Sequence, residues 1–163
     1  MSDIVREFKA ESLALIEQML VLLEICETPQ GQPSEIEKFG LFADRIMGSA
    51  KQLSFDQSVS SVDLTMIVQL SELCKILGYK SAKLKPQEGL WSVAVGVLLD
   101  ATDELRRLIA EFQAKSQLAG GLAAGLIARL KWLNEQFAAD IDGGVPMSQV
   151  QNLLNHLKSD SND

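Results

Sequence analysis

Residues 34–55 read SEIEKFGLFADRIMGSAKQLSF, and the spacing of the apolar residues in this stretch decides the fold. These residues recur three or four positions apart, at Ile36, Phe39, Ala43, Ile46, Ala50 and Leu53. Such spacing is typical of one face of an α-helix and not of a strand, because side chains in a strand alternate with a period of two. We therefore predict an amphipathic helix over about residues 34–55, with Ser34 as its N-cap.

The same helical spacing recurs along the rest of the chain. Further helices are predicted over about residues 3–27, 61–77, 87–113, 121–139 and 148–157. Gly78 is expected to end the third helix, and no stretch shows the alternation of a strand. We predict an all-α fold in which the first four helices form a four-helix bundle, with additional C-terminal helices beside it. Residues 1–139 are expected to form the helical bundle, and residues 140–163 a linker, a short C-terminal helix and a disordered tail at 159–163.

Charge and composition exclude several classes of partner. The chain has 163 residues, a formal net charge of −7 and a pI near 4.7. That charge opposes binding to nucleic acid, which needs a surplus of Lys and Arg. No apolar run reaches the roughly 18 residues needed to span a bilayer, and residues 1–7 lack the basic leader and apolar core of a secretory signal. We therefore expect a cytoplasmic protein, with no nucleic acid and no membrane among its partners.

Residues that could carry catalysis are few. His156 is the one histidine of the sequence, on the polar side of the predicted last helix, and a catalytic histidine needs neighbours that position it. The carboxylates of Asp100, Asp103 and Glu104 are interpreted as a solvated helix face. The sequence contains no phosphate-binding loop, nucleophile elbow or dinucleotide fingerprint. We interpret the protein as one that is not an enzyme and that needs no cofactor or metal.

Three further features of the sequence have structural interpretations. Cys26 and Cys74 are expected to be small buried hydrophobes and not part of a disulfide or a zinc site. The spacing of Gly121 and Gly125 favours close approach of helices over phosphate binding. A basic run around Tyr79 is interpreted as a solvated loop, and its members are Lys75, Lys80, Lys83 and Lys85.

Residues 42–50, FADRIMGSA, followed by the LSF of residues 53–55, resemble the core motif of histidine phosphotransfer (HPt) domains. The resemblance is closest to the N-terminal phosphotransfer domain of the CheA-type chemotaxis kinases. The first-helix pattern of that family is matched by Phe8, Glu11 and residues 20–24, LVLLE, and residues 98–105, LLDATDEL, resemble the corresponding segment of its fourth helix. The resemblance covers about residues 4–138. It implies a four-helix bundle of HPt type and a place in bacterial two-component, phosphorelay or chemotaxis-like signalling.

The chain departs from the HPt motif at the two positions that carry its chemistry. Asp44 stands where the family has the phosphorylated histidine, and Met47 where it has a lysine. In the family the imidazole accepts the phosphoryl group and the ammonium offsets its negative charge. A lone carboxylate on a bundle helix also lacks the Mg²⁺ ligands that surround the phosphorylated aspartate of receivers. We therefore expect a degenerate phosphotransfer position at Asp44 and Met47, and no catalytic residue.

One face of the helix over residues 34–55 keeps the features of a docking surface. At about 100° per residue, Asp44 points about 200° away from a buried Ile46, and Gly48 and Lys51 follow close to the direction of Asp44. A glycine inside an exposed helix costs about 1 kcal/mol relative to alanine, and the HPt resemblance implies that it lets a partner approach. An apolar margin is expected at Gly40, Leu41, Met47 and Phe55. The predicted partner-binding residues are Leu41, Asp44, Met47, Gly48 and Lys51.

The main functional hypothesis is a catalytically inactive HPt-like binding module. It would dock on a response-regulator receiver or a histidine-kinase domain without accepting phosphate. A phosphatase or regulator acting on phosphorylated receivers is one alternative, although the sequence contains neither an Asp-x-x-x-Gln nor a Glu-x-x-Asn signature. A self-associating structural helical bundle, such as a homodimer, is another. The sequence leaves the identity of the partner open.

Overall fold

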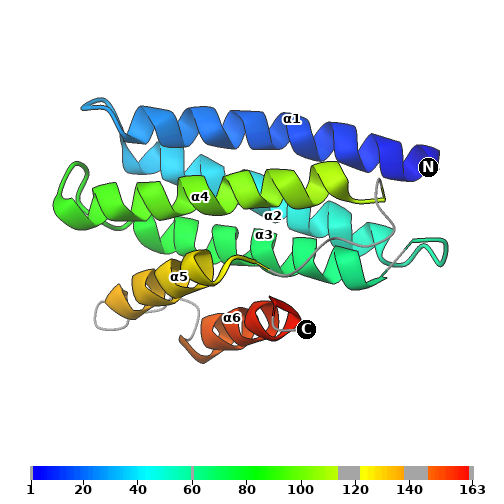
Figure 1. Cartoon of the computed structure of the whole chain (residues 1–163). Helices are drawn as coiled ribbons and strands as arrows, with labels where there is room; N and C mark the ends of the chain where they lie inside the picture. The colour runs from blue at the N-terminus through cyan, green and yellow to red at the C-terminus, as the bar shows by residue number, and fades with distance from the viewer. Residues whose placement is uncertain (1, 60, 114–121, 138–146, 162–163) are drawn as a thin grey trace.

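The computed structural model describes residues 2–59, 61–113, 122–137 and 147–161, and in these residues it is built of six α-helices and the turns between them (Figure 1). The prediction of an all-α fold is therefore confirmed. The helices are α1 (Asp3–Cys26), α2 (Pro33–Leu53), α3 (Ser61–Ser81), α4 (Gly89–Glu111), α5 (Ala124–Gln136) and α6 (Met147–Ser161).

The first four helices form an antiparallel bundle in which each packs beside the next and α4 returns to lie against α1 (Figure 1). The core is filled by large aliphatic and aromatic side chains from all four helices, among them Ile16, Ile46 and Leu70. Trp91 of α4 is also fully buried, and its indole Nε1 donates a hydrogen bond to the carbonyl oxygen of Cys26, 2.9 Å away. That bond satisfies the only polar atom of the indole side chain at the end of the bundle where α1 stops.

Helices α5 and α6 form an antiparallel pair that covers the outer side of α3 and α4 (Figure 1). Val150, Leu154 and Leu157 of α6 are buried, so this helix packs onto the bundle. The predicted disordered tail is therefore wrong for residues 159–161, because α6 continues to Ser161. Residues 162 and 163 of the predicted tail lie outside the described residues, as does Gly121. Gly125 is exposed with open space beside it, so the predicted close helix approach is wrong at that residue.

The N-cap of α2 lies two residues earlier in the sequence than predicted. Its N-cap is Gln32, not Ser34, and Pro33 occupies the first helical position. Proline suits that position because its φ is already helical and its missing N–H needs no partner there. The backbone N–H of Gln32 donates to the Glu35 carboxylate at 2.9 Å, which closes the first turn and binds a negative charge at the positive end of the helix.

The third helix runs on through Gly78 to Ser81, so the prediction that Gly78 ends it is wrong. The glycine instead allows α2 and α3 to pack closely. A Cβ atom on Gly78 would lie 2.9 Å from the Phe39 ring and 3.6 Å from Cα of Gly40. Two glycines therefore face each other where the helices meet, and the Phe39 ring fills the space that a side chain at position 78 would need.

Both cysteines are buried free thiols, as expected for small core hydrophobes. Burial raises the pKa of the Cys26 thiol and of the Cys74 thiol, in each case to about 12. Both therefore remain protonated at neutral pH. Within the described residues no helix combines the length and the hydropathy that crossing a bilayer would require.

Candidate functional site

The helical phase predicted for α2 is confirmed. Ile46 is 0% exposed, and Gly48 and Lys51 lie on the opposite, exposed side of the helix. The other residues predicted to be buried on α2 also line the core, namely Phe39, Ala43, Ala50 and Leu53. The partner-binding residues predicted from the sequence are therefore to be sought on the outward face of α2.

The buried face of α2 includes two residues that were predicted to be exposed, and both lie on the side of the helix that packs against α3. Met47 is only 9% exposed, so its placement on the margin of the outward face is wrong. Gly40 is also buried, under the Tyr79 ring of α3. The reason is that α2 packs between two neighbours and approaches α3 most closely, which covers the side of the helix that carries both residues. The predicted apolar margin is confirmed for Leu41, at 47% exposed, and for Phe55, at 85%.

Asp44 is half-exposed and is held by an ion pair to a neighbouring helix. Its Oδ1 lies 2.9 Å from Nζ of Lys75 on α3, and the two side chains are 42% and 32% exposed. The hydrogen bond to Asp44 is the main cause that raises the pKa of Lys75 above its usual 10.5. A lysine whose pKa is raised by folding stabilises the fold below the unfolded pKa and loses that contribution as the pH rises through the raised value. The Lys75 ammonium therefore remains charged at neutral pH.

The basic run around Tyr79 is part of α3 and the turn after it, so its interpretation as a solvated loop is wrong for two of its members. Lys75 forms an ion pair with Asp44. Lys80 is buried, and its Nζ donates a hydrogen bond to Oδ1 of Asn134 on α5 at 3.2 Å. Lys83 and Lys85 are exposed, as predicted. The local sequence could not separate the paired lysines from the exposed ones, because the partners Asp44 and Asn134 lie on other helices, α2 and α5.

Gly48 opens onto a groove between α1 and α2. The groove has a volume of about 770 Å³ and is lined on the α2 side by Asp44, Arg45 and Gly48, and on the α1 side by residues that include Glu11 and Leu15. Apart from the adjacent backbone of α2 itself, a Cβ atom placed on Gly48 would meet no atom of the described residues within 4 Å. No contact within the described chain therefore requires glycine at position 48. Glycine destabilises the helix relative to alanine there, and no packing contact offsets that cost.

We expect Gly48→Ala to raise the free energy of unfolding by about 0.5–1 kcal/mol, because the methyl group enters open space and a helix favours alanine. Gly78→Ala provides the matched contrast within α3. It should lower the free energy of unfolding by about 1–3 kcal/mol, since its methyl group would press on the buried Phe39 ring. Denaturant unfolding of the two variants measures both changes. A destabilised Gly48→Ala would mean that position 48 is packed and not open.

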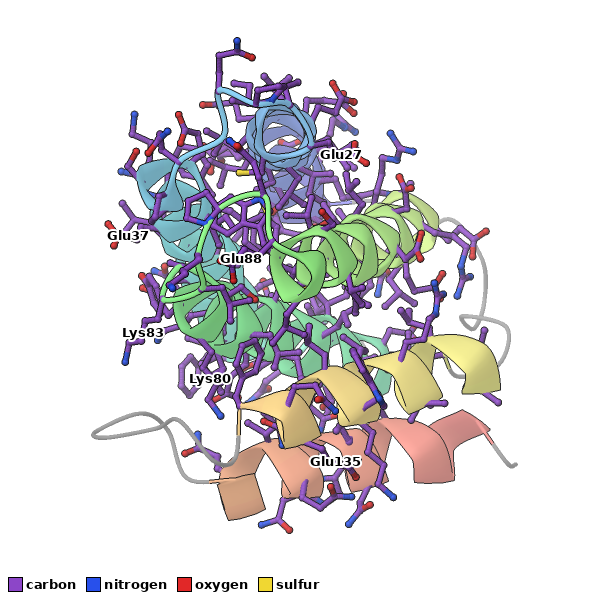
Figure 2. All side chains as sticks on the ribbon, turned by 90° about the vertical axis from the view of Figure 1, so that its left-hand side faces the viewer. Glu27, Glu37, Lys80, Lys83, Glu88 and Glu135 are labelled. Carbon is purple, nitrogen blue, oxygen red and sulfur yellow. The ribbon has the colours of Figure 1, made fainter. Side chains whose placement is uncertain are left out.

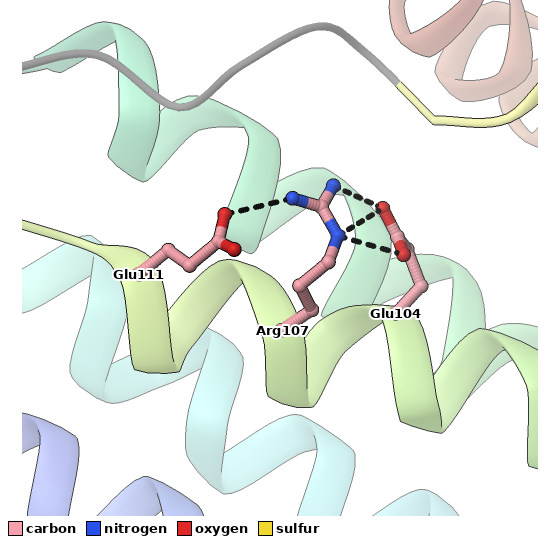
Figure 3. A network of polar contacts seen from close by, with 3 residues as sticks. All are labelled: Glu104, Arg107 and Glu111. Atoms are coloured by element: carbon pink, nitrogen blue, oxygen red, sulfur yellow. Dashed lines mark hydrogen bonds and ion pairs between the residues drawn. The ribbon is translucent and has the colours of Figure 1, made fainter. Parts of the chain in front are cut away.

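The carboxylates of α4 are neutralised by arginines. Arg107 lies between Glu104 and Glu111, with Nη2 2.5 Å from Glu104 Oε1 and Nη1 2.9 Å from Glu111 Oε2 (Figure 3). The hydrogen bond from Arg107 to Glu104 raises the pKa of the Arg107 guanidinium further. Charged groups of opposite sign one turn apart on the same helix stabilise it. These carboxylates are therefore structural groups of α4.

Two other acidic side chains of α4 are paired in the same way. Arg106 Nη2 lies 2.8 Å from Asp103 Oδ1, and Asp100 is bound by Arg129 of α5. The second pair joins α4 to α5.

His156, the remaining catalytic candidate, is exposed on α6. Among the described residues no group of three or more potential metal ligands is present.

Sequence reasoning missed one residue of the site, Lys75. It was grouped with the neighbouring lysines, and the only signal that could have separated it is its position on the helix face that meets α2. Comparison with protein-family models, with curated proteins and with solved structures finds no match to this chain. The functional argument therefore depends on the local geometry of α2 and on the sequence motif.

Proposed function

We propose that this protein is an HPt-like binding module that docks on a response-regulator receiver or a histidine-kinase domain without accepting phosphate. The observation that carries the proposal is Gly48, an exposed glycine in the C-terminal half of α2 with open space beside it. A partner helix or loop can approach the α2 backbone there more closely than at any residue with a side chain. The HPt-like motif around Gly48 supports a signalling domain as that partner.

The chemistry at this face supports binding and not phosphotransfer. Asp44 replaces the nucleophilic imidazole, and its carboxylate is already engaged by the Lys75 ammonium. Met47 replaces the lysine of the motif, and its neutral thioether supplies no positive charge; the side chain is also buried. What the face offers a partner is an apolar side chain at Leu41, an accessible backbone at Gly48 and a cation at Lys51. Met47, which the sequence placed in this set, is removed from it.

The protein is expected to remain unlabelled when it is incubated with a histidine kinase from the same genome and radiolabelled ATP. The physical reason is that no imidazole lies at position 44 and that the remaining histidine, His156, sits on α6 away from the α2 face. Labelling that is acid-labile and lost in His156→Ala would contradict this expectation. Labelling lost in Asp44→Asn would contradict it as well.

Docking itself is tested by calorimetric titration of isolated receiver and kinase domains from the same genome into the intact protein. We expect saturable binding of at least one of these domains, with no dependence on ATP. Absence of binding to every such domain, together with a mass in light scattering that rises with protein concentration, would replace the proposal with a self-associating bundle.

A further inference from the structure

A second groove lies on the other side of α2, between its first turns and the end of α3. Its volume is about 500 Å³. The apolar lining consists of Leu41, Tyr79 and Ala82, and the polar lining of Ser34, Glu37, Lys38 and Lys83. Figure 2 shows Glu37 and Lys83 on the same outer side of the α2–α3 pair, with Lys80 nearer to α5. The groove therefore combines an apolar floor with charged groups along its edges.

The positive charge of this groove is not neutralised within the described chain. Lys38 and Lys83 are both exposed, and no carboxylate of the described residues lies within ion-pair distance of either. The buried Lys80 has a neutral amide oxygen as its partner. Burial is the main cause that lowers the pKa of Lys80, and the nearby charge of Lys83 lowers it further. Lys80 lies outside the lining of the groove, so two ammonium groups, those of Lys38 and Lys83, stand there against one carboxylate, Glu37, in a protein whose formal net charge is −7.

The apolar floor is built by a close contact between helices. A Cβ atom on Gly40 would lie 2.9 Å from Cε1 of Tyr79, so the absence of a side chain at position 40 lets the ring lie close to α2. The ring remains 37% exposed, and Leu41 beside it 47%. Two large hydrophobic side chains thus face solvent next to two lysines that have no carboxylate partner among the described residues. Exposing apolar surface does not stabilise the fold, so this arrangement indicates a binding surface.

We propose that the α2–α3 groove binds an acidic peptide segment of another protein that carries an apolar anchor side chain. The anchor would lie on Leu41 and Tyr79, and the carboxylates of the peptide would face Lys38 and Lys83. Charge complementarity of this kind speeds association and selects against basic partners. Leu41 belongs both to this groove and to the face proposed for docking, but the groove extends to Tyr79 and Lys83 whereas Gly48 opens toward α1. Peptide binding in the groove can therefore be tested apart from the docking proposed for Gly48.

A peptide explains the groove better than a membrane or a nucleic acid does. Those partners present many phosphates over a wide area and need a broad basic surface. Here the cationic edge consists of a few lysines around an apolar floor, a carboxylate lies among them, and the rest of the protein is acidic. A short segment with both an apolar and an acidic part matches that combination.

The test uses the full chain and fluorescein-labelled short peptides in which Asp and Glu flank a single Leu, Phe or Trp. Fluorescence anisotropy should show saturable binding that weakens as salt is added, because exposed charges are screened. Peptides with Lys in place of the acidic residues should not bind. Combining Lys38→Glu with Lys83→Glu should weaken binding by about tenfold or more.

Two variants make the test specific to the groove. Lys131→Glu on α5 makes the same kind of charge change at an exposed lysine elsewhere, and it should have little effect. Gly40→Ala keeps the charges but displaces the Tyr79 ring, and it should weaken binding while the unfolding transition stays cooperative. Three results would overturn the inference: no saturable binding by any acidic peptide, an equal loss in Lys131→Glu, or binding to phosphatidylserine vesicles with none to peptides. Loss of peptide binding in Gly48→Arg would contradict the inference as well, because Gly48 does not line this groove.

Discussion

Replacing Ile46 with alanine is expected to lower the free energy of unfolding by about 2–5 kcal/mol, through lost transfer energy and the cavity left behind. Ile46 is 0% exposed and lies in the middle of α2, where neighbouring helices cover it. Because those neighbours are themselves held in a packed core, the cavity should close only in part. Urea unfolding followed by circular dichroism gives the change directly.

The matched control for Ile46→Ala is Leu41→Ala on the same helix. Leu41 is 47% exposed, so its truncation removes little buried surface and should change the free energy of unfolding by about 0.5 kcal/mol or less. Similar losses for the two variants would contradict the orientation of α2 described above, and with it the exposure of Asp44 and Gly48.

Gly48→Arg is expected to reduce the affinity for the docking partner by about tenfold or more. The substitution places a long cationic side chain at the point where the partner must approach the α2 backbone, and truncated or blocked residues at the centre of an interface have the largest effects. The fold should tolerate the change, because within the described part of the chain the new Cβ would have only the adjacent α2 backbone within 4 Å. Calorimetric titration against the receiver or kinase domain measures the loss.

Gly96→Arg is the control for this substitution. Gly96 also lies within a bundle helix, α4, and a Cβ atom there likewise meets nothing within 4 Å. Arginine at position 96 therefore adds the same charge and bulk to a surface with no proposed role in docking. Equal loss of affinity in the two variants would assign the effect to net charge and not to the α2 face.

The helices and the phase of α2 could be predicted from the sequence because they depend on local spacing. An apolar residue every three or four positions is enough to identify the buried face of a helix, and Ile46, Ala50 and Leu53 follow that rule. The errors arose where contacts between helices decide the outcome. From the sequence alone Gly78 is expected to end a helix. In the structure it lies inside α3, where the absence of a side chain leaves space for the Phe39 ring of α2 and lets the two helices pack closely.

The candidate site could be predicted only in part for the same reason. The exposure of Gly48 and Lys51 follows from the helical phase alone. The burial of Met47 does not, because it depends on how closely α3 approaches α2. The ion pair between Asp44 and Lys75 joins residues that are distant in sequence, and no local pattern relates them.

The measurement that tests the central claim most directly is a map of amide chemical shifts in the isotope-labelled protein during titration with the receiver or kinase domain that binds it. The account predicts that the largest changes fall on the outward face of α2, at Leu41, Asp44, Gly48 and Lys51, and on the side of α1 that lines the groove beside Gly48. Changes confined to α5 and α6, or spread evenly over the bundle, would show that the α2 face is not the docking surface.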